Sequence, residues 1–320
     1  MSLTLSYSRI RVWKSCHYDH YQKYVNKLVP KKKSPALIRG SIIHECLEAY
    51  YNGKSWKKVW QRFADEFYEE AFEEEIESLG DIPYMAKELL EAYFHFYEKE
   101  DEGTEYLNNE LHFELPLIDD INLEGYIDAI IEDEDGKIWV KDYKTFRSMP
   151  EYNSLRFNYQ SAIYMWALRE MGYEVEGMIW DIVTAKTPSK PQLLKDGSVS
   201  KRKLDSNPYT VRKGIIELGL DPNDYLDLIH SVKYENYFHR FKIRYNQNLV
   251  DALMEDIKQT ALEIRDNGDR LKDMNLETKF KSSYMDLWQA EVMNSDVEFI
   301  IDNHFERRET NGKKNKGDRK

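Results

Sequence analysis

The spacing of apolar residues changes along the chain, and each change marks a different kind of element. In the first hundred residues apolar side chains recur every three or four positions, which is typical of helices. From about residue 104 the period falls to two, which favours half-buried strands. We predict helices over 6–29, 40–51, 55–79, 83–100 and 156–171, and strands at Glu110–Leu117, Asn122–Ile131, Lys137–Thr145 and Met178–Ala185.

The part of the chain after the last predicted strand begins differently. Residues 186–214 are polar and basic and are interrupted by prolines and glycines, so a long loop or mobile flap is expected there. The helical period returns over 223–265, and the basic tail 307–320 lacks apolar residues, which predicts disorder. Because no repeat or clear linker is visible, we expect one elaborated domain over 1–306. Its parts would be helices to about 103, a core over 104–185, the loop, and C-terminal helices over 215–306.

Composition narrows the class of protein. The 320 residues are 41% hydrophobic and 13% aromatic, which is enough to build a core and excludes a disordered chain. No apolar run approaches the ~18 residues that a membrane span needs, and the start does not resemble a secretory signal. Two cysteines, Cys16 and Cys46, cannot form a disulfide framework or supply four cluster ligands. We therefore expect a cytoplasmic protein.

The net charge of −12 conceals an uneven distribution. Residues 65–135 hold 26 acidic residues and two lysines, whereas 23–33, 186–203 and 307–320 are strongly basic. One explanation is solubility together with an ordinary basic tail. The other is a protein whose basic surface binds a polyanion such as nucleic acid, because the local field matters more than the total charge.

Candidate chemistry lies in the predicted hairpin. A hairpin centred on Asp135 would place Asp128 directly across from Asp142, and neighbours of that kind have Cβ atoms ~4.5–5.5 Å apart. Two carboxylates so close repel each other unless a cation or a proton lies between them. Lys144 leaves the same face of its strand as Asp142. Oxygen ligands of this kind suit Mg²⁺ or Mn²⁺; the alternative is a solvated hairpin face with a surface ion pair.

Two further polar residues lie on predicted helices. His44 follows Gly40 by four residues, and Gln160 precedes Tyr164 by one helical turn. A lone histidine among apolar neighbours is commonly a core residue, and a lone glutamine usually has no special role. His44 and Gln160 become significant only through their order along the chain relative to Asp128 and Asp142.

In chain order, G-x-x-x-H, G-x-I-D, D-Y-K-T and Q-x-x-x-Y resemble the motifs of the PD-(D/E)XK nuclease superfamily. Within it, the sequence is similar to the RecB-like exonuclease branch, which includes phage and CRISPR-adaptation exonucleases, over residues 3–290. The resemblance implies a mixed α/β fold: a restriction-endonuclease-like αβββαβ core with an N-terminal helical region and C-terminal helices.

The segment around Cys16 also resembles the start of the iron–sulfur members of that branch, in which this cysteine would be a cluster ligand. Those relatives carry three more cysteines near the C-terminus, and here Lys279, Ser282 and Trp288 occupy the matching places. We therefore expect a member without an iron–sulfur cluster, in which Cys16 is an ordinary buried thiol and Trp288 packs in place of the cluster.

The resemblance implies roles for the motif residues. Mg²⁺ or Mn²⁺ would be held by His44, Asp128, Asp142 and the backbone carbonyl of Tyr143. Lys144 would orient the attacking water, Gln160 would position the water or a phosphate, and Tyr164 would support Gln160 or a base. Expected contacts to the DNA backbone come from the basic loop: Lys201, Arg202 and Lys203.

Other residues are weaker candidates. Tyr209 could stack a base, although a core role suits any single tyrosine, and Glu110 or Glu114 could add to the acidic site without being catalytic.

The resulting hypothesis is a Mg²⁺-dependent DNA exonuclease of recombination, repair or phage DNA metabolism, acting on DNA with single-stranded character or free ends. The sequence leaves open whether a helicase or recombination partner exists, and association with a membrane is not expected. The main alternative is a nucleic-acid-binding or scaffold subunit of a helicase–nuclease complex with little activity of its own. A third is an interaction protein whose acidic segment 65–135 binds a basic partner.

Overall fold

The computed structural model describes residues 2–32, 34–70, 76, 80–200, 202–277 and 282–308. Contacts between them define two compact units. The first comprises Met1–Lys33, Phe113–Gly125 and Ala252–Lys320, and the second comprises Ser34–His112 and Tyr126–Asp251. The expectation of one elaborated domain stays a prediction. None of the described helices has the length and apolar content of a membrane span.

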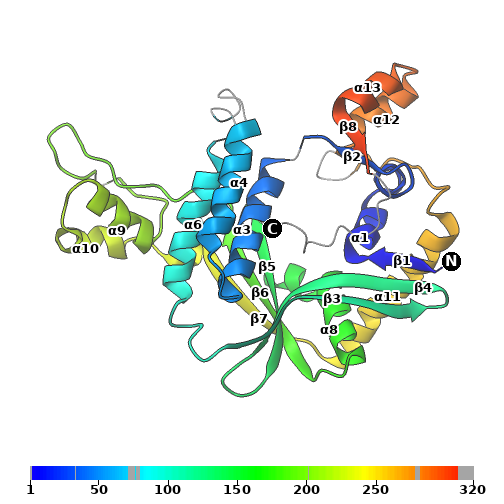
Figure 1. Cartoon of the computed structure of the whole chain (residues 1–320), viewed down its shortest axis with the longest axis horizontal. Helices are drawn as coiled ribbons and strands as arrows, with labels where there is room; N and C mark the ends of the chain where they lie inside the picture. Colours follow the sequence, from blue (N-terminus) through cyan, green and yellow to red (C-terminus); the bar gives the residue numbers. More distant parts are fainter. Residues whose placement is uncertain are drawn as a thin grey trace. The chain divides into compact units, whose positions relative to one another are not determined.

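The second unit combines a sheet with helices (Figure 1). Strand β4 pairs antiparallel with β5, β5 pairs parallel with β6, and β6 pairs antiparallel with β7, while β3 pairs with β4. The mixed α/β fold predicted from the sequence is therefore confirmed. The strands are β3 (Glu105–Ile118), β4 (Ile121–Glu132), β5 (Ile138–Phe146), β6 (Val175–Thr184) and β7 (Phe238–Arg244), and the parts of β3 and β4 within Phe113–Gly125 belong to the first unit.

Helices supply most of the core of this unit. Helices α3, α4 and α6 pack against one another. Helix α3 also contacts β5, and α8 contacts β6. Their buried side chains, including Cys46 on α3, join Tyr143 and Val183 of the sheet in one apolar cluster. The helices are α3 (Pro35–Tyr51), α4 (Trp56–Glu70), α6 (Ile82–Tyr97), α7 (Tyr152–Arg156), α8 (Tyr159–Glu170), α9 (Pro208–Glu217) and α10 (Leu226–His230), with 3-10 turns at Pro222–Tyr225 and Tyr234–Asn236.

The structure corrects three boundaries predicted in this unit. The helix expected over 156–171 is divided, because the side chain of Asn158 caps α8 by accepting a hydrogen bond from the Gln160 amide (2.9 Å). The helix expected over 223–265 contains strand β7, which pairs with β6. Gly177 permits this pairing, since a Cβ there would lie 2.2 Å from the carbonyl oxygen of Ile243. The last part of the expected loop 186–214 is helix α9.

The first unit is built from the two ends of the chain. Strand β1 (Leu3–Ser6) runs parallel to the start of β4, and β2 (Leu28–Pro30) pairs with β8 (Phe305–Arg307). The single helix expected over 6–29 is broken, because Cys16 is extended (φ −163°). The helices are α1 (Tyr7–Ser15), α2 (His17–His20), a π-helix (Tyr21–Val25), α11 (Gln247–Asn267), α12 (Met285–Val292) and α13 (Val297–His304).

An apolar cluster joins these two ends. It contains Cys16 and Leu287, with Trp288 partly buried against it. The Oγ of Ser282 donates a hydrogen bond to Asp19 (2.5 Å). Lys279 lies outside the described residues, as do residues 309–320 of the tail for which disorder was predicted over 307–320. Arg307 of that tail is instead part of β8, where it pairs with Leu28. Packing of Trp288 near Cys16 agrees with the sequence-based expectation, while the absence of a cluster stays a prediction.

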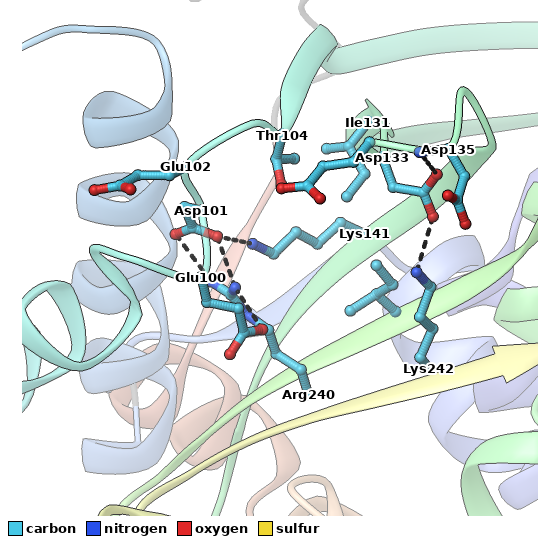
Figure 2. Close-up of a pocket in the computed structure, with 12 residues that line it drawn as sticks. Glu100, Asp101, Glu102, Thr104, Ile131, Asp133, Asp135, Lys141, Arg240 and Lys242 are labelled. Atoms are coloured by element: carbon cyan, nitrogen blue, oxygen red, sulfur yellow. Dashed lines mark hydrogen bonds and ion pairs between the residues drawn. The ribbon is translucent and has the colours of Figure 1, made fainter.

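A buried network of charges around Asp181 ties the strands of the second unit together, and Figure 2 shows three of its members, Lys141, Arg240 and Asp101. The Nζ of Lys141 lies 3.0 Å from Oδ2 of Asp181, and Nε of Arg240 donates to the same oxygen (2.8 Å). Lys141 and Asp181 are almost completely buried. Arg240 also pairs with Asp101 at 2.6 Å. Because each charge has an opposite charge within hydrogen-bonding distance, the burial of this network is tolerated.

The network borders a cavity of about 400 Å³. Lys141, Arg240 and Lys242 contribute positive charge to its wall. Its acidic residues are Glu100, Asp101, Glu102, Asp133, Glu134 and Asp135.

Replacing Asp181 should strongly destabilise the fold. Asp181→Asn leaves Lys141 and Arg240 without their shared counter-charge, so we expect the free energy of unfolding to fall by about 3–5 kcal/mol. Denaturant unfolding monitored by circular dichroism measures this, with the exposed Asp196→Asn as the matched control. A loss below ~1 kcal/mol would show that the network does not hold the strands.

Candidate active site

The two hairpin aspartates come together as the strand register predicts. Strands β4 and β5 pair from Glu132↔Ile138 to Ala129↔Lys141, so Asp128 and Asp142 are next in the series. The regular ladder ends at this point. Instead, the backbone N–H of Tyr143 donates to Oδ2 of Asp128 (2.9 Å). The carboxylate of Asp128 is therefore fixed by the strand that carries Asp142.

Lys144 and Gln160 both contact Asp142. The Nζ of Lys144 lies 2.6 Å from Oδ2 of Asp142, and Nε2 of Gln160 donates to Oδ1 (3.1 Å). Asp142 is fully buried, whereas the Lys144 side chain is 32% exposed. Strand alternation places the lysine and aspartate on the same face of β5, as predicted. The lysine can therefore reach solvent or a ligand while it remains paired.

Tyr164 links this group to β4. Nε2 of Gln160 donates to the hydroxyl of Tyr164 (2.8 Å), and that hydroxyl donates to the backbone carbonyl of Tyr126 (2.6 Å). A line of hydrogen bonds therefore runs from Asp142 through α8 to β4. The helical spacing of Q-x-x-x-Y accounts for it, because residues four apart lie on one helix face.

His44 reaches the site from α3. Its Nε2 lies 3.0 Å from Oδ2 of Asp128. Burial alone would lower the pKa of His44, but the hydrogen bond to Asp128 and the charge of Asp128 outweigh burial and raise it. Burial would raise the pKa of Asp128, and His44, Lys144 and the Tyr143 amide together lower it. The pair is thus stabilised as imidazolium and carboxylate when no cation is bound.

Asp142 has the opposite tendency. The pKa of Asp142 is raised to about 7. Burial is the main cause and the negative charge of Asp128 adds to it, while Lys144 acts in the opposite direction. The pKa values of two acids in one site are thereby shifted in opposite directions, which is common at functional sites. A divalent cation would compete with protons for both carboxylates, because metal ligands must be deprotonated.

Two glutamates extend the set of possible cation ligands. Ligand atoms of His44, Glu48 and Glu110 lie within 4.8 Å of one another, and all three residues are partly buried. Glu48 is one helical turn after His44, so its position could have been found from spacing. Glu110 was considered as a contributor, but its place could not be derived, because its backbone is left-handed (φ 56°) within β3.

This donor set suits a divalent cation. Carboxylate oxygens with one imidazole are ligands that Mg²⁺ and especially Mn²⁺ accept. Tyr143, which was expected to offer its carbonyl, is buried with its ring 6.0 Å from that of His44. Glu114 accepts hydrogen bonds from Thr4 and Asn122 in the first unit and is not part of this set.

The predicted DNA contacts lie on the loop that follows β6 in the second unit. Arg202 and Lys203 are exposed, while Lys201 lies outside the described residues. The surrounding loop is folded back on itself, with the Ser189 amide donating to the carbonyl of Asp205 (2.8 Å). Tyr209 packs against the helical core, which is the role expected of most tyrosines.

Comparison with known proteins identifies the class. A family model described as the PD-(D/E)XK nuclease superfamily matches residues 4–275, so the chain belongs to that superfamily. Members are nucleases that typically use divalent metal ions, and membership implies DNA as the substrate class. No curated protein matches the chain.

Two solved structures are similar to this chain. One is a candidate exonuclease from Eubacterium rectale, with 13% identity and a TM-score of 0.47, covering 89% of this chain and 92% of that one. Another is SSO0001, with 12% identity and a TM-score of 0.30, covering 81% and 75%. Similarity at this level does not identify a substrate.

The site should bind a divalent cation detectably. Mn²⁺ at a hundred times its dissociation constant should stabilise the fold by about 2.7 kcal/mol, seen as a rise in the midpoint of thermal unfolding. Asp142→Asn should remove most of that rise, whereas the exposed Asp224→Asn should retain it. An equal rise in both variants would place the binding of Mn²⁺ elsewhere.

Proposed function

We propose that this chain is a divalent-metal-dependent DNA exonuclease. The observation that carries the proposal is that Asp128, Asp142, Lys144, Gln160 and His44 meet at one point in the second unit. They come from two strands and two helices, and each contacts another member of the group. Membership of the nuclease superfamily supports the same reaction class.

In the proposed reaction each side chain has a distinct task. Asp128, Asp142 and His44 would hold Mg²⁺ or Mn²⁺, with Glu48 and Glu110 available beside them. The cation would lower the pKa of a bound water and offset charge on the phosphate. Lys144 orients the attacking water and balances negative charge on the phosphate oxygens. Gln160 fixes Asp142, and Tyr164 fixes Gln160.

Substrate binding would involve the basic loop. Arg202 and Lys203 are exposed and, with Lys201, would contact the phosphates of the DNA backbone. Other basic side chains of this loop are already engaged: Lys190 pairs with Glu217 (2.8 Å) and Lys186 with Asp205 (3.3 Å). Arg202, Lys203 and the exposed Lys195 are therefore the described basic residues of the loop that could contact DNA.

The finer assignments rest on the motif resemblance. It favours the RecB-like branch, attack from DNA ends, and a role in recombination, repair or phage DNA metabolism. The missing C-terminal cysteines favour a protein without an iron–sulfur cluster. Purified protein is therefore expected to be colourless, and elemental analysis is expected to find no stoichiometric iron. A brown, iron-containing preparation would contradict this part of the proposal.

Removing either aspartate should abolish cleavage. Asp128→Asn and Asp142→Asn each delete a charge that the cation needs, so turnover of labelled linear DNA in Mg²⁺ or Mn²⁺ should be lost. DNA binding should persist or improve, because a negative group facing phosphate is gone. Asp224→Asn serves as the control. Near-normal cleavage by either site variant would refute the proposed site.

A comparison of DNA forms tests the mode of attack. An exonuclease degrades linear DNA and spares circular DNA of the same sequence. Equal degradation of both would indicate an endonuclease. No degradation of any form, with DNA still bound, would favour the alternative of a scaffold subunit.

Lys144 should affect chemistry more than cation binding. Lys144→Ala should reduce the single-turnover cleavage rate by roughly 10²–10⁴-fold, the range for loss of a group acting directly on the reacting atoms. The affinity of the Lys144→Ala variant for Mn²⁺, measured by calorimetry, should be nearly the same as that of the native protein, because lysine is not a metal ligand. Weak Mn²⁺ binding with a normal rate at saturating Mn²⁺ would assign Lys144 to a structural ion pair.

Removing the positive charges of Arg202 and Lys203 should weaken DNA binding and leave the rate of cleavage of bound DNA unchanged. For Arg202→Ala with Lys203→Ala, we expect the slope of log affinity against log salt to fall by about 1.5–2. The single-turnover rate at saturating DNA should change little. Neutralising Lys186 and Lys190, which are paired with acids, is the matched control. An unchanged slope in the first double variant would remove the loop from the substrate path.

A further inference from the structure

An exposed tyrosine lies beside the proposed catalytic residues and has no part in the mechanism above. The side chain of Tyr126 is 57% exposed, although its neighbour Ile127 is completely buried. Tyr126 precedes Asp128 by two residues on β4, so the two side chains leave the same side of that strand. Their Cα atoms are therefore about 6.5–7 Å apart, which is close to the size of one nucleotide.

Contacts on two sides hold this tyrosine in place. Its backbone carbonyl accepts the hydrogen bond from Tyr164 (2.6 Å), which connects it to Gln160 and Asp142. Its ring lies 4.6 Å from the ring of His112, which is also exposed. A ring that is already oriented loses little conformational entropy when another flat group stacks on it.

The charge around the site favours an uncharged contact of this kind. Glu48 and Glu110 lie beside His44, and their negative charge opposes the close approach of a DNA phosphate. A nucleobase carries no charge and can stack on an aromatic ring despite these acids. Stacking of one base contributes ~1–3 kcal/mol in single-strand-binding proteins.

We propose that Tyr126, supported by His112, is a stacking platform for one unpaired nucleobase of the DNA strand being cut. The proposal rests on the proposed function and specifies its substrate. Only an unpaired base can place its face on the ring, so the strand enters the site single-stranded or frayed. Tyr126 is thus a positioning residue that fixes the strand relative to Asp128 and Asp142.

Binding of two DNA forms tests the proposal without cleavage. In EDTA, Tyr126→Ala should weaken binding of a labelled single-stranded oligonucleotide roughly 5- to 100-fold by fluorescence anisotropy. Tyr126→Phe should bind like the native protein. A relaxed circular duplex, which has neither a free end nor an unpaired loop, should bind both variants equally. Tyr84→Ala is the matched control, because Tyr84 is 42% exposed on α6 and its ring lies 5.6 Å from Lys190.

A stacking signal provides the second readout. The emission of 2-aminopurine in the oligonucleotide should be quenched by the native protein and by Tyr126→Phe, and not by Tyr126→Ala. The Ala variant should fold normally, since Tyr164 bonds to the backbone of residue 126, and thermal unfolding verifies this. Unchanged affinity and quenching in a folded Ala variant would overturn the proposal. An equal loss of binding to the circular duplex would also overturn it.

These results separate the platform from the nuclease activity. If the native protein quenches 2-aminopurine in a Tyr126-dependent way but cuts no DNA in Mg²⁺ or Mn²⁺, the platform stands and the proposed function fails. If it cuts DNA through Asp142 while Tyr126→Ala binds and quenches normally, the function stands and the platform fails.

Discussion

The ion pair between Lys141 and Asp181 determines which way β5 faces. Tyr143 of β5 lies opposite Asp181 of β6, and Lys141 reaches across diagonally to the same aspartate. Side chains alternate along a strand, so Lys141 lies on the same face of β5 as Tyr143, which packs in the cluster with α3 and α6. Asp142 therefore lies on the opposite face. A slip of one residue would bury Asp142 among the tyrosines and move the lysine into the site. The proposed active site therefore depends on charges that take no part in its chemistry.

The same principle of paired charges explains the electrostatics of the site. Asp128 has a lowered pKa because a histidine, a lysine and a backbone amide all face it, whereas burial dominates at Asp142 and raises its pKa. In this arrangement neither carboxylate lacks a compensating proton or positive charge. The site is consequently stable before any cation binds, and its geometry need not be assembled by the metal.

Sequence spacing predicted the contacts that depend only on the geometry of a single hairpin or helix. The register of the β4–β5 hairpin and the contact between Gln160 and Tyr164 both follow from fixed backbone periods, and both could be derived from residue numbers. Strand β7 could not, because its pairing depends on a distant glycine at 177. The left-handed backbone of Glu110 was also hidden, since β3 reads as an uninterrupted strand. The spacing of apolar residues predicts which face of a strand or helix a residue occupies. It does not predict where a strand bends.

The burial of both cysteines makes the chain convenient for site-specific chemistry. Cys16 and Cys46 are at most 5% exposed, and burial raises the pKa of both thiols, that of Cys46 to about 12. Thiolates are the reactive species toward maleimides, so both native residues should react slowly in the folded state. A single cysteine introduced on the surface would then carry a fluorophore without removal of the native pair. With one such cysteine in each unit, the distance between two attached probes could be measured while Cys16 and Cys46 stay in place.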